Sequence, residues 1–180
     1  MRNILVWGNH HCSNESGFQD TFDKLLELHT VFPRPMFHQI DMFSDQSITG
    51  LKENLDNGPI ILVVIVGDEC LVDEQPTYEL IKRFESFFAS LSQFPRLSLI
   101  TCRLIPVKQA SIYNQHKFGS ANYKLRTLHS RFNQMFIPTD GTFCSLDFKL
   151  TQCLNKRGGK KLARIIFQYL NAKFPKYFLT

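Results

Sequence analysis

Residues 60–66 read IILVVIV, and residues 3–7 read NILVW with Gly8 directly after them. Both runs are short and almost wholly apolar, which is typical of strands that are buried on both faces of a parallel sheet. The first run is followed by Phe18, Phe22 and Leu26 at helical spacing. Parallel strands need crossover connections, so strand runs that alternate with helical patterns predict an α/β fold.

The same alternation continues along the rest of the chain and predicts one domain over residues 1–180. We expect strands at 3–7, 36–43, 60–66, 97–105 and 142–148. We expect helices that begin after Ser13 or Asn14, and at 47–55, 75–91, 120–136 and 155–173, with a loop over 106–119. This order predicts a three-layer α/β/α sandwich around a five-stranded, mainly parallel sheet in flavodoxin-like order. Its functional crevice should lie beyond the carboxyl ends of the strands.

The composition excludes several classes of protein. A hydrophobic fraction of 43% with 21% charged residues excludes a disordered chain, and the apolar run at 60–66 is too short to span a membrane. The five cysteines are odd in number and form no CxxC pair, so we expect neither a disulfide framework nor a metal site. No signal peptide is visible at the N-terminus, which favours a cytoplasmic protein, and no motif calls for a cofactor.

Charge is distributed unevenly along the sequence. Residues 1–100 carry 7 basic and 14 acidic side chains, a balance of −7, whereas residues 101–180 carry 14 basic and 2 acidic ones, a balance of +12. A basic face attracts polyanions. The alternative is that the fold interleaves the two halves and neutralises them.

The last helix concentrates this positive charge. Arg157, Lys160, Lys161 and Arg164 recur at i, i+3, i+4 and i+7, beside Lys156, and no acidic residue follows Lys149. Cations near a helix N-terminus oppose its macrodipole, so stability alone does not favour the arrangement. It indicates an anionic partner, and alanine at positions 160, 161 and 164 should leave stability unchanged or slightly higher. The alternative is an ordinary solvated helix face.

A second basic stretch, residues 108–131, interleaves cations with aromatic rings. Its cations include Lys117, Lys124 and Arg126. We expect Tyr113 and Phe118 to be exposed in a loop, and Tyr123 and Phe132 to pack inside the fold. Alternating cations and rings suit single-stranded RNA, because bases stack while phosphates meet the basic groups. The alternative is a merely soluble loop.

Three blocks resemble those of the SGNH (GDSL-type) hydrolases: NILVWGNH at 3–10, VVIVGDEC at 63–70 and LTQCLNKRGGKKLARII at 150–166. The resemblance implies their fold and places their nucleophilic serine at His10 and their oxyanion-hole asparagine at Glu69. Their catalytic Asp and His fall on Leu150 and Cys153. Leucine cannot orient a base, and glutamate repels a developing oxyanion. The resemblance therefore implies a hydrolase fold that has lost its chemistry, not an enzyme.

The opening RNILVWGN, the VVIVGDEC block and the altered last block also resemble the OSK domains of insect germ-plasm proteins. That resemblance implies a cytoplasmic, non-catalytic domain that binds mRNA in germ-plasm granules, alongside other germ-plasm proteins and without a small-molecule substrate or a membrane. Two alternatives stay open. One is an esterase with a rearranged site, in which His10 or His11 is the base and Cys12, Cys70 or Cys153 the nucleophile. The other is a protein-interaction scaffold whose acidic half binds a basic partner.

Overall fold

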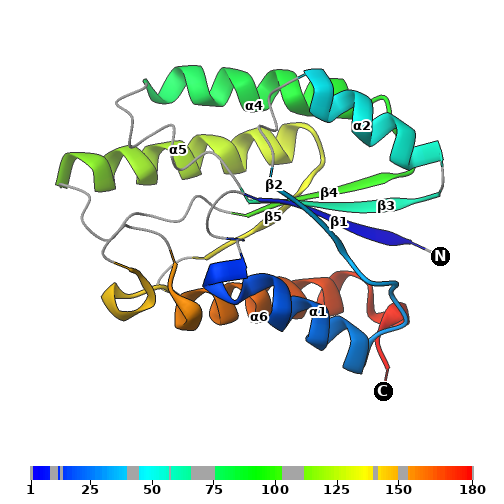
Figure 1. Cartoon of the computed structure of the whole chain (residues 1–180). Helices are drawn as coiled ribbons and strands as arrows, with labels where there is room; N and C mark the ends of the chain where they lie inside the picture. Colours follow the sequence, from blue (N-terminus) through cyan, green and yellow to red (C-terminus); the bar gives the residue numbers. More distant parts are fainter. Residues whose placement is uncertain are drawn as a thin grey trace.

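A parallel sheet of five strands forms the middle layer of the molecule (Figure 1). The computed structural model describes residues 2–8, 12, 14–39, 45–56, 58–65, 76–102, 112–139, 142–149 and 154–179. The strands are β1 (Asn3–Gly8), β2 (Met36–Gln39), β3 (Ile60–Ile65), β4 (Leu97–Cys102) and β5 (Met135–Ile137). They lie in the order β2-β1-β3-β4-β5. The α/β class, the five parallel strands and the flavodoxin-like order predicted from the sequence are confirmed.

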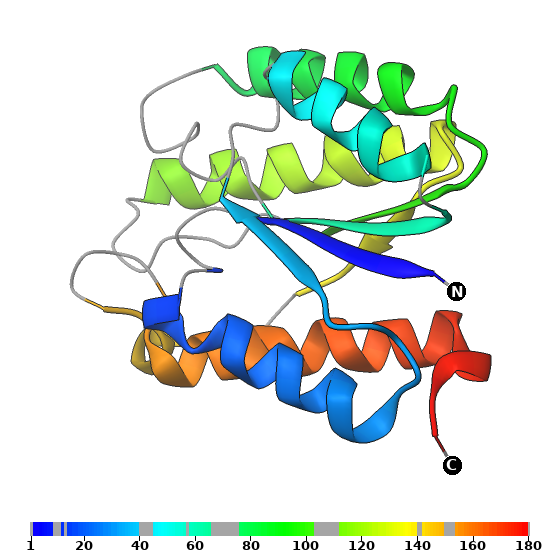
Figure 2. The same cartoon turned by 45° about the vertical axis from the view of Figure 1, so that its right-hand side comes forward.

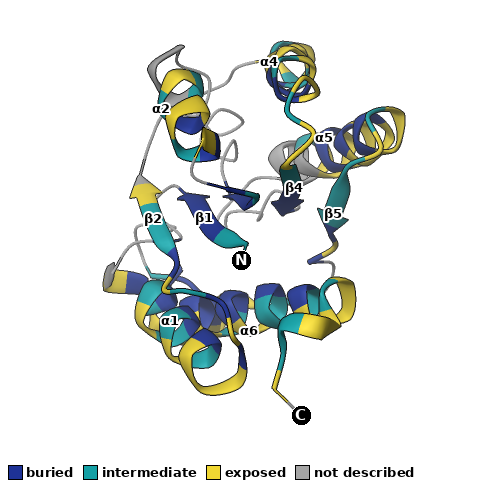
Figure 3. Cartoon of the chain, turned by 90° about the vertical axis from the view of Figure 1, so that its right-hand side faces the viewer, coloured by how far each residue is buried: buried dark blue, intermediate teal, exposed yellow. Residues whose placement is uncertain are grey.

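Helices cover both faces of the sheet (Figures 2 and 3). One face carries α2 (Asp45–Asp56), α4 (Thr77–Leu91) and α5 (Ile112–Arg131), and the other carries α1 (Phe18–His29) and α6 (Lys156–Lys173). Short 3-10 turns are η2 (Asn14–Ser16), η3 (Ser145–Asp147) and η4 (Pro175–Tyr177). None of the helices within the described ranges is long and apolar enough to cross a membrane.

The place of β3 in the middle of the sheet explains why residues 60–66 are all apolar. All six residues of β3 are buried. Ile60, Leu62 and Val64 pack in the core beneath α2, α4 and α5. Ile61, Val63 and Ile65 pack in the core formed with α1 and α6. Because successive side chains point to opposite faces, a strand between two helical layers has to be apolar throughout.

Helices α1 and α6 begin close together, and glycines make this approach possible. A Cβ atom on Gly159 would overlap the carbonyl of Ser16, and one on Gly158 would overlap the carbonyl of Asp147. Helix α1 itself starts after Gly17, which has the left-handed φ of 70° and serves as its N-cap residue. The expectation that Ser13 or Asn14 caps α1 is wrong, since Asn14 belongs to η2 and Ser13 lies outside the described residues.

The region around α5 differs most from the sequence prediction. Helix α5 begins at Ile112 within the expected loop, and it ends at Arg131 instead of continuing to Phe136. Asn133 adopts a left-handed φ of 52°, and the Gln134 amide donates to the carbonyl of His129 over 2.8 Å. This turn reverses the chain into β5. The fifth strand is therefore Met135–Ile137, and the strand expected at 142–148 is wrong because that segment contains η3.

Candidate active site

The carboxyl ends of the strands meet at one edge of the sheet, where the sequence blocks converge. Gly8, the last residue of β1, is the register partner of Ile65, the last residue of β3. Helix α6 also begins at this edge, on the side where α1 starts (Figures 1 and 2). The end of β1, the end of β3 and the start of α6 thus surround one place. His10, Glu69, Leu150 and Cys153 lie outside the described residues.

Cys12 lies directly against the end of β1. A Cβ atom on Gly8 would come within 2.5 Å of the Cys12 Cβ and 2.6 Å of its Sγ, so only glycine leaves room for this thiol. Cys12 is buried, with 5% of its surface exposed, and its thiol forms no disulfide. It is therefore a nucleophile-type side chain in contact with the end of β1. It is also one of the three thiols that the sequence offers as candidate nucleophiles.

Two other free thiols, Cys102 and Cys144, differ from Cys12 in position. Cys102 ends β4 in the interior, where burial raises its pKa to about 12 and keeps it a neutral thiol at physiological pH. It cannot supply a thiolate nucleophile. Cys144 is exposed and lies before η3, where its backbone amide binds Asp147. Cys144 is therefore an exposed thiol that lies beside Asp147.

A buried carboxylate anchors the start of α6. Asp147 is fully buried and accepts hydrogen bonds from the Cys144 amide at 2.9 Å and from Lys161 Nζ at 2.8 Å. Its other oxygen lies 3.1 Å from Arg157 Nε. Burial acts to raise the pKa of Asp147, but the bonds from Lys161 and Cys144 outweigh it and hold this pKa below its usual value. Asp147 is therefore ionised and paired at neutral pH.

The segment before α6 is fixed at both ends. Phe148 and Leu154 form an antiparallel bridge, and the Asn155 amide donates to the carbonyl of Asp147 over 2.9 Å. The Asn155 side chain caps α6 by accepting from the amides of Arg157 and Gly158, as its N-cap position favours. These contacts hold Phe148 and Leu154 side by side directly before α6 begins.

The basic face on α6 is not the uniform cationic stripe that the sequence predicts. Lys161 is only half-exposed and donates to Asp147 and, over 2.9 Å, to the carbonyl of Thr142. Arg157 is paired with the same carboxylate. Lys156, Lys160 and Arg164 are exposed. The acidic partner lies nine residues before α6 begins, so counting charges within the helix missed it. The expectation that these cations oppose stability is therefore wrong for Arg157 and Lys161.

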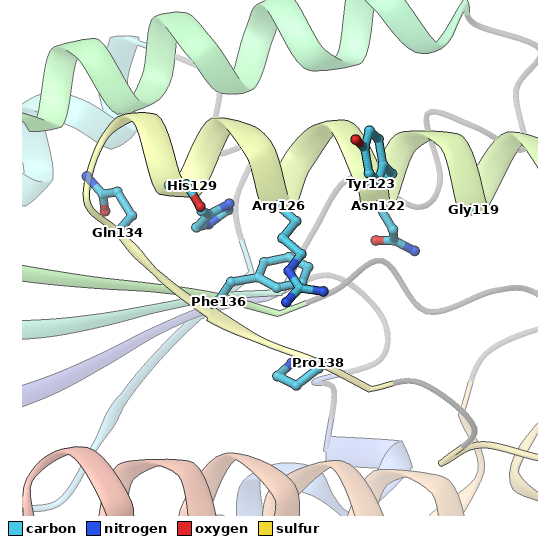
Figure 4. Close-up of a pocket in the computed structure, with 9 residues that line it drawn as sticks. Gly119, Asn122, Tyr123, Arg126, His129, Gln134, Phe136 and Pro138 are labelled. Carbon is cyan, nitrogen blue, oxygen red and sulfur yellow. The ribbon is translucent and has the colours of Figure 1, made fainter.

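The second basic stretch also differs from the prediction. Lys117, Lys124 and Arg126 all lie on α5, and Tyr113 and Phe118 belong to the same helix instead of a loop. The exposure of the Tyr113 and Phe118 rings lies outside what the structure describes. Tyr123 was expected to pack inside, but it is 75% exposed. Phe132 does pack against the core, as expected. Arg126 faces a cavity beside β5 that could not be detected from the sequence pattern (Figure 4).

Comparison with known proteins shows the fold. No family model and no curated protein matches the sequence. Among solved structures, the acetyl xylan esterase AlAXEase is similar with a TM-score of 0.74 and 12% identity over 94% of this chain and 100% of its own. TesA has a TM-score of 0.73 and 11% identity over 96% and 99%. A lipase/acylhydrolase from Enterococcus faecalis has 0.70 and 12% over 96% and 97%.

The chain therefore has the SGNH hydrolase fold, as the three sequence blocks imply. The same comparisons correct the functional expectation. The matching structures include an acetyl xylan esterase and a lipase/acylhydrolase, so the prediction of a non-catalytic RNA-binding domain in germ-plasm assembly is wrong. The pairing of Arg157 and Lys161 with Asp147 also weakens the charge argument for that prediction, because two of its cations already have a carboxylate partner within the chain.

Proposed function

We propose that this chain hydrolyses carboxylic esters at the carboxyl edge of its sheet, with a rearranged set of catalytic residues. The observation that carries the proposal is the correspondence of nearly the whole chain, 94–96%, with esterases and acylhydrolases. In open α/β sheets ligands bind beyond the carboxyl ends of the strands, which is where β1, β3 and the start of α6 meet.

The rearranged chemistry would use a thiol in place of the serine hydroxyl. The Cys12 sulfur would attack the ester carbonyl and form a carbon–sulfur bond, while His10 or His11 takes the thiol proton and returns it to the departing alcohol. Water would then hydrolyse the thioester, releasing the acid and restoring the thiol. Its position against Gly8 supports Cys12 as nucleophile. Cys70 and Cys153, which the sequence also offers, are the other candidates.

We infer that within this fold the chain's sequence kinship lies with the OSK domains of insect germ-plasm proteins. The stretches RNILVWGN at 2–9 and VVIVGDEC at 63–70 support this inference, as do the changes from the usual catalytic residues at His10, Glu69, Leu150 and Cys153. Because the nucleophilic serine of the SGNH hydrolases is replaced in this chain, the identity of the nucleophile is the main question for ester hydrolysis. Ester hydrolysis here has to depend on this chain's own thiols and imidazoles.

The experiment compares hydrolysis of p-nitrophenyl acetate by the wild type and by single variants. Cys12→Ser keeps the small buried volume while replacing the thiolate nucleophile, and it should lower kcat/KM at least about 100-fold. Cys70→Ser and Cys153→Ser test the other two thiols in the same way. Cys144→Ser is the matched control, since this exposed thiol lies away from the end of β1. Equal activity in all four folded variants would contradict the thiol mechanism.

A further inference from the structure

A cavity of about 430 Å³ lies between α5 and the edge strand β5 (Figure 4). Its volume falls within the range of about 300–1,000 Å³ that small-molecule sites occupy. Strands β3 and β4 separate β5, which lines the cavity, from β1, where Gly8 contacts Cys12. Its walls combine polar, aromatic and small residues: Gly119, Asn122, Tyr123, Arg126, His129, Ser130, Gln134, Phe136 and Pro138.

The charge of the cavity favours an anion. Among the described residues that line it, Arg126 is the charged side chain, and none of them carries a carboxylate. Within the described part of the chain, Arg126 has no acidic partner, whereas Arg131 on the same helix is paired with Glu85. Arg126 projects over the cavity, where its planar fork of donors can bind the carboxylate of a ligand.

A buried imidazole adds an unused hydrogen-bond acceptor to the wall. His129 is 2% exposed, and its Nδ1 lies 2.7 Å from the carbonyl of Leu125. That nitrogen must carry the proton, because a carbonyl oxygen only accepts, so Nε2 is left as an acceptor. Nε2 has no partner among the described residues. Phe88 and Phe136 hold the ring, at centroid distances of 4.7 and 4.9 Å.

These two features lie one turn apart on the same helix. Residues three apart occupy the same helix face, so Arg126 and His129 both face β5. Phe136 and Pro138 form the opposite, largely apolar side. The wall of the cavity therefore combines a cation, an imidazole whose buried Nε2 has no partner among the described residues, and an apolar side.

We propose that this cavity binds a small hydroxylated carboxylate, such as a sugar acid. Its carboxylate pairs with Arg126, one of its hydroxyl groups donates to Nε2 of His129, and its carbon skeleton lies on Phe136 and Pro138. The Gln134 amide and the Ser130 hydroxyl in the same wall offer further polar contacts. The proposal does not depend on ester hydrolysis, because the site is built from other strands and other residues.

The test is titration of the ¹⁵N-labelled chain with D-glucuronate, followed by amide chemical shifts, with D-glucose as the neutral analogue. We expect saturable shifts confined to residues 119–138 and binding of D-glucose that is at least tenfold weaker. Shifts that cluster around Lys160 and Arg164 would show general attraction of anions to the exposed cations of α6. That result, or the lack of saturable shifts, would overturn the proposal.

The variants Arg126→Gln and Lys124→Gln distinguish binding at a specific site from a general attraction of anions to positive charge. Arg126→Gln should weaken D-glucuronate binding at least tenfold. Lys124→Gln makes the same charge change on the same helix at an exposed position outside the cavity wall, and it should change affinity less than twofold. His129→Phe keeps a ring in the aromatic packing but removes the acceptor, and it should also weaken binding. Equal losses in Arg126→Gln and Lys124→Gln would contradict the assigned site.

Discussion

Asp147 determines how the first turn of α6 is held in place. Its carboxylate is fully buried, and it is held by one backbone amide and two cations of α6. Removing one partner of a buried ion pair leaves the other without full compensation, which destabilises the protein. Asp147 and its two cations therefore support the structure of the proposed catalytic edge. The two cations differ in this role from the exposed lysines beside them.

Replacing Lys161 with alanine should lower the free energy of unfolding by about 1 to 3 kcal/mol, because Asp147 then loses its shortest charged hydrogen bond. The adjacent Lys160→Ala is the matched control, since Lys160 is exposed and should change stability by less than about 0.5 kcal/mol. Urea unfolding of the two variants and the wild type measures both values. Equal stability of all three would show that Asp147 does not depend on Lys161.

His129 makes stability depend on pH. Burial lowers the pKa of His129 to about 4, which is below the ordinary value of 6.5. The unfolded chain therefore takes up this proton first, so stability falls as the pH falls from about 6.5 to about 4 and levels off below that. The shift corresponds to about 3 kcal/mol over the whole range.

His129→Phe should flatten the stability curve between pH 6.5 and 4, as followed by urea unfolding at several pH values. His38→Gln is the control, because His38 is exposed and its replacement should leave the slope unchanged. If the free energy of unfolding of His129→Phe falls with pH as steeply as that of the wild type, other groups cause this pH dependence.

At the scale of the elements, the patterns predicted the strands and helices that lie within the core. They failed at the end of α5, where Leu125, Leu128, Phe132 and Phe136 continue at helical spacing. The left-handed turn at Asn133 ends the helix there, so Phe136 belongs to β5. A periodic pattern shows which residues face the core, but it does not show where one element passes into the next.

The close start of α1 and α6 yields a prediction about two glycines. Gly159→Ala should lower the free energy of unfolding by about 1 to 3 kcal/mol, because its Cβ would overlap the Ser16 carbonyl. Gly50→Ala in α2 has no heavy atom near its Cβ and should raise stability by roughly 0.5 to 1 kcal/mol through helix propensity. Thermal unfolding distinguishes the two. A neutral Gly159→Ala would mean that the helices separate easily.

At the scale of the whole molecule, the uneven charge along the sequence is partly cancelled by the fold. Lys149 pairs with Glu15, and Arg131 with Glu85, so cations of the second half meet carboxylates of the first. Pairing of α1 with α6 and of α4 with α5 brings these halves together. The sequence showed both signs, but only the three-dimensional arrangement shows which charges are neighbours.

The position of the candidate site could likewise be predicted only in part from the sequence. Three sequence blocks placed it at the carboxyl edge, and the pairing of Gly8 with Ile65 agrees with that placement. The contact of Cys12 with Gly8 was not predictable, because it depends on the path of the chain after β1. The cavity beneath α5 was missed for the same reason, since its walls come from two elements whose boundaries the sequence pattern misplaced.

The central claim, that the chain hydrolyses esters, is tested most directly by counting product. The purified wild-type chain is mixed with excess p-nitrophenyl acetate, and the nitrophenolate released per protein molecule is followed over time. We predict continuous release well beyond one equivalent, and its loss when the chain is unfolded in urea. Release that stops at or below one equivalent, or that equals the rate of the unfolded chain, would contradict the claim.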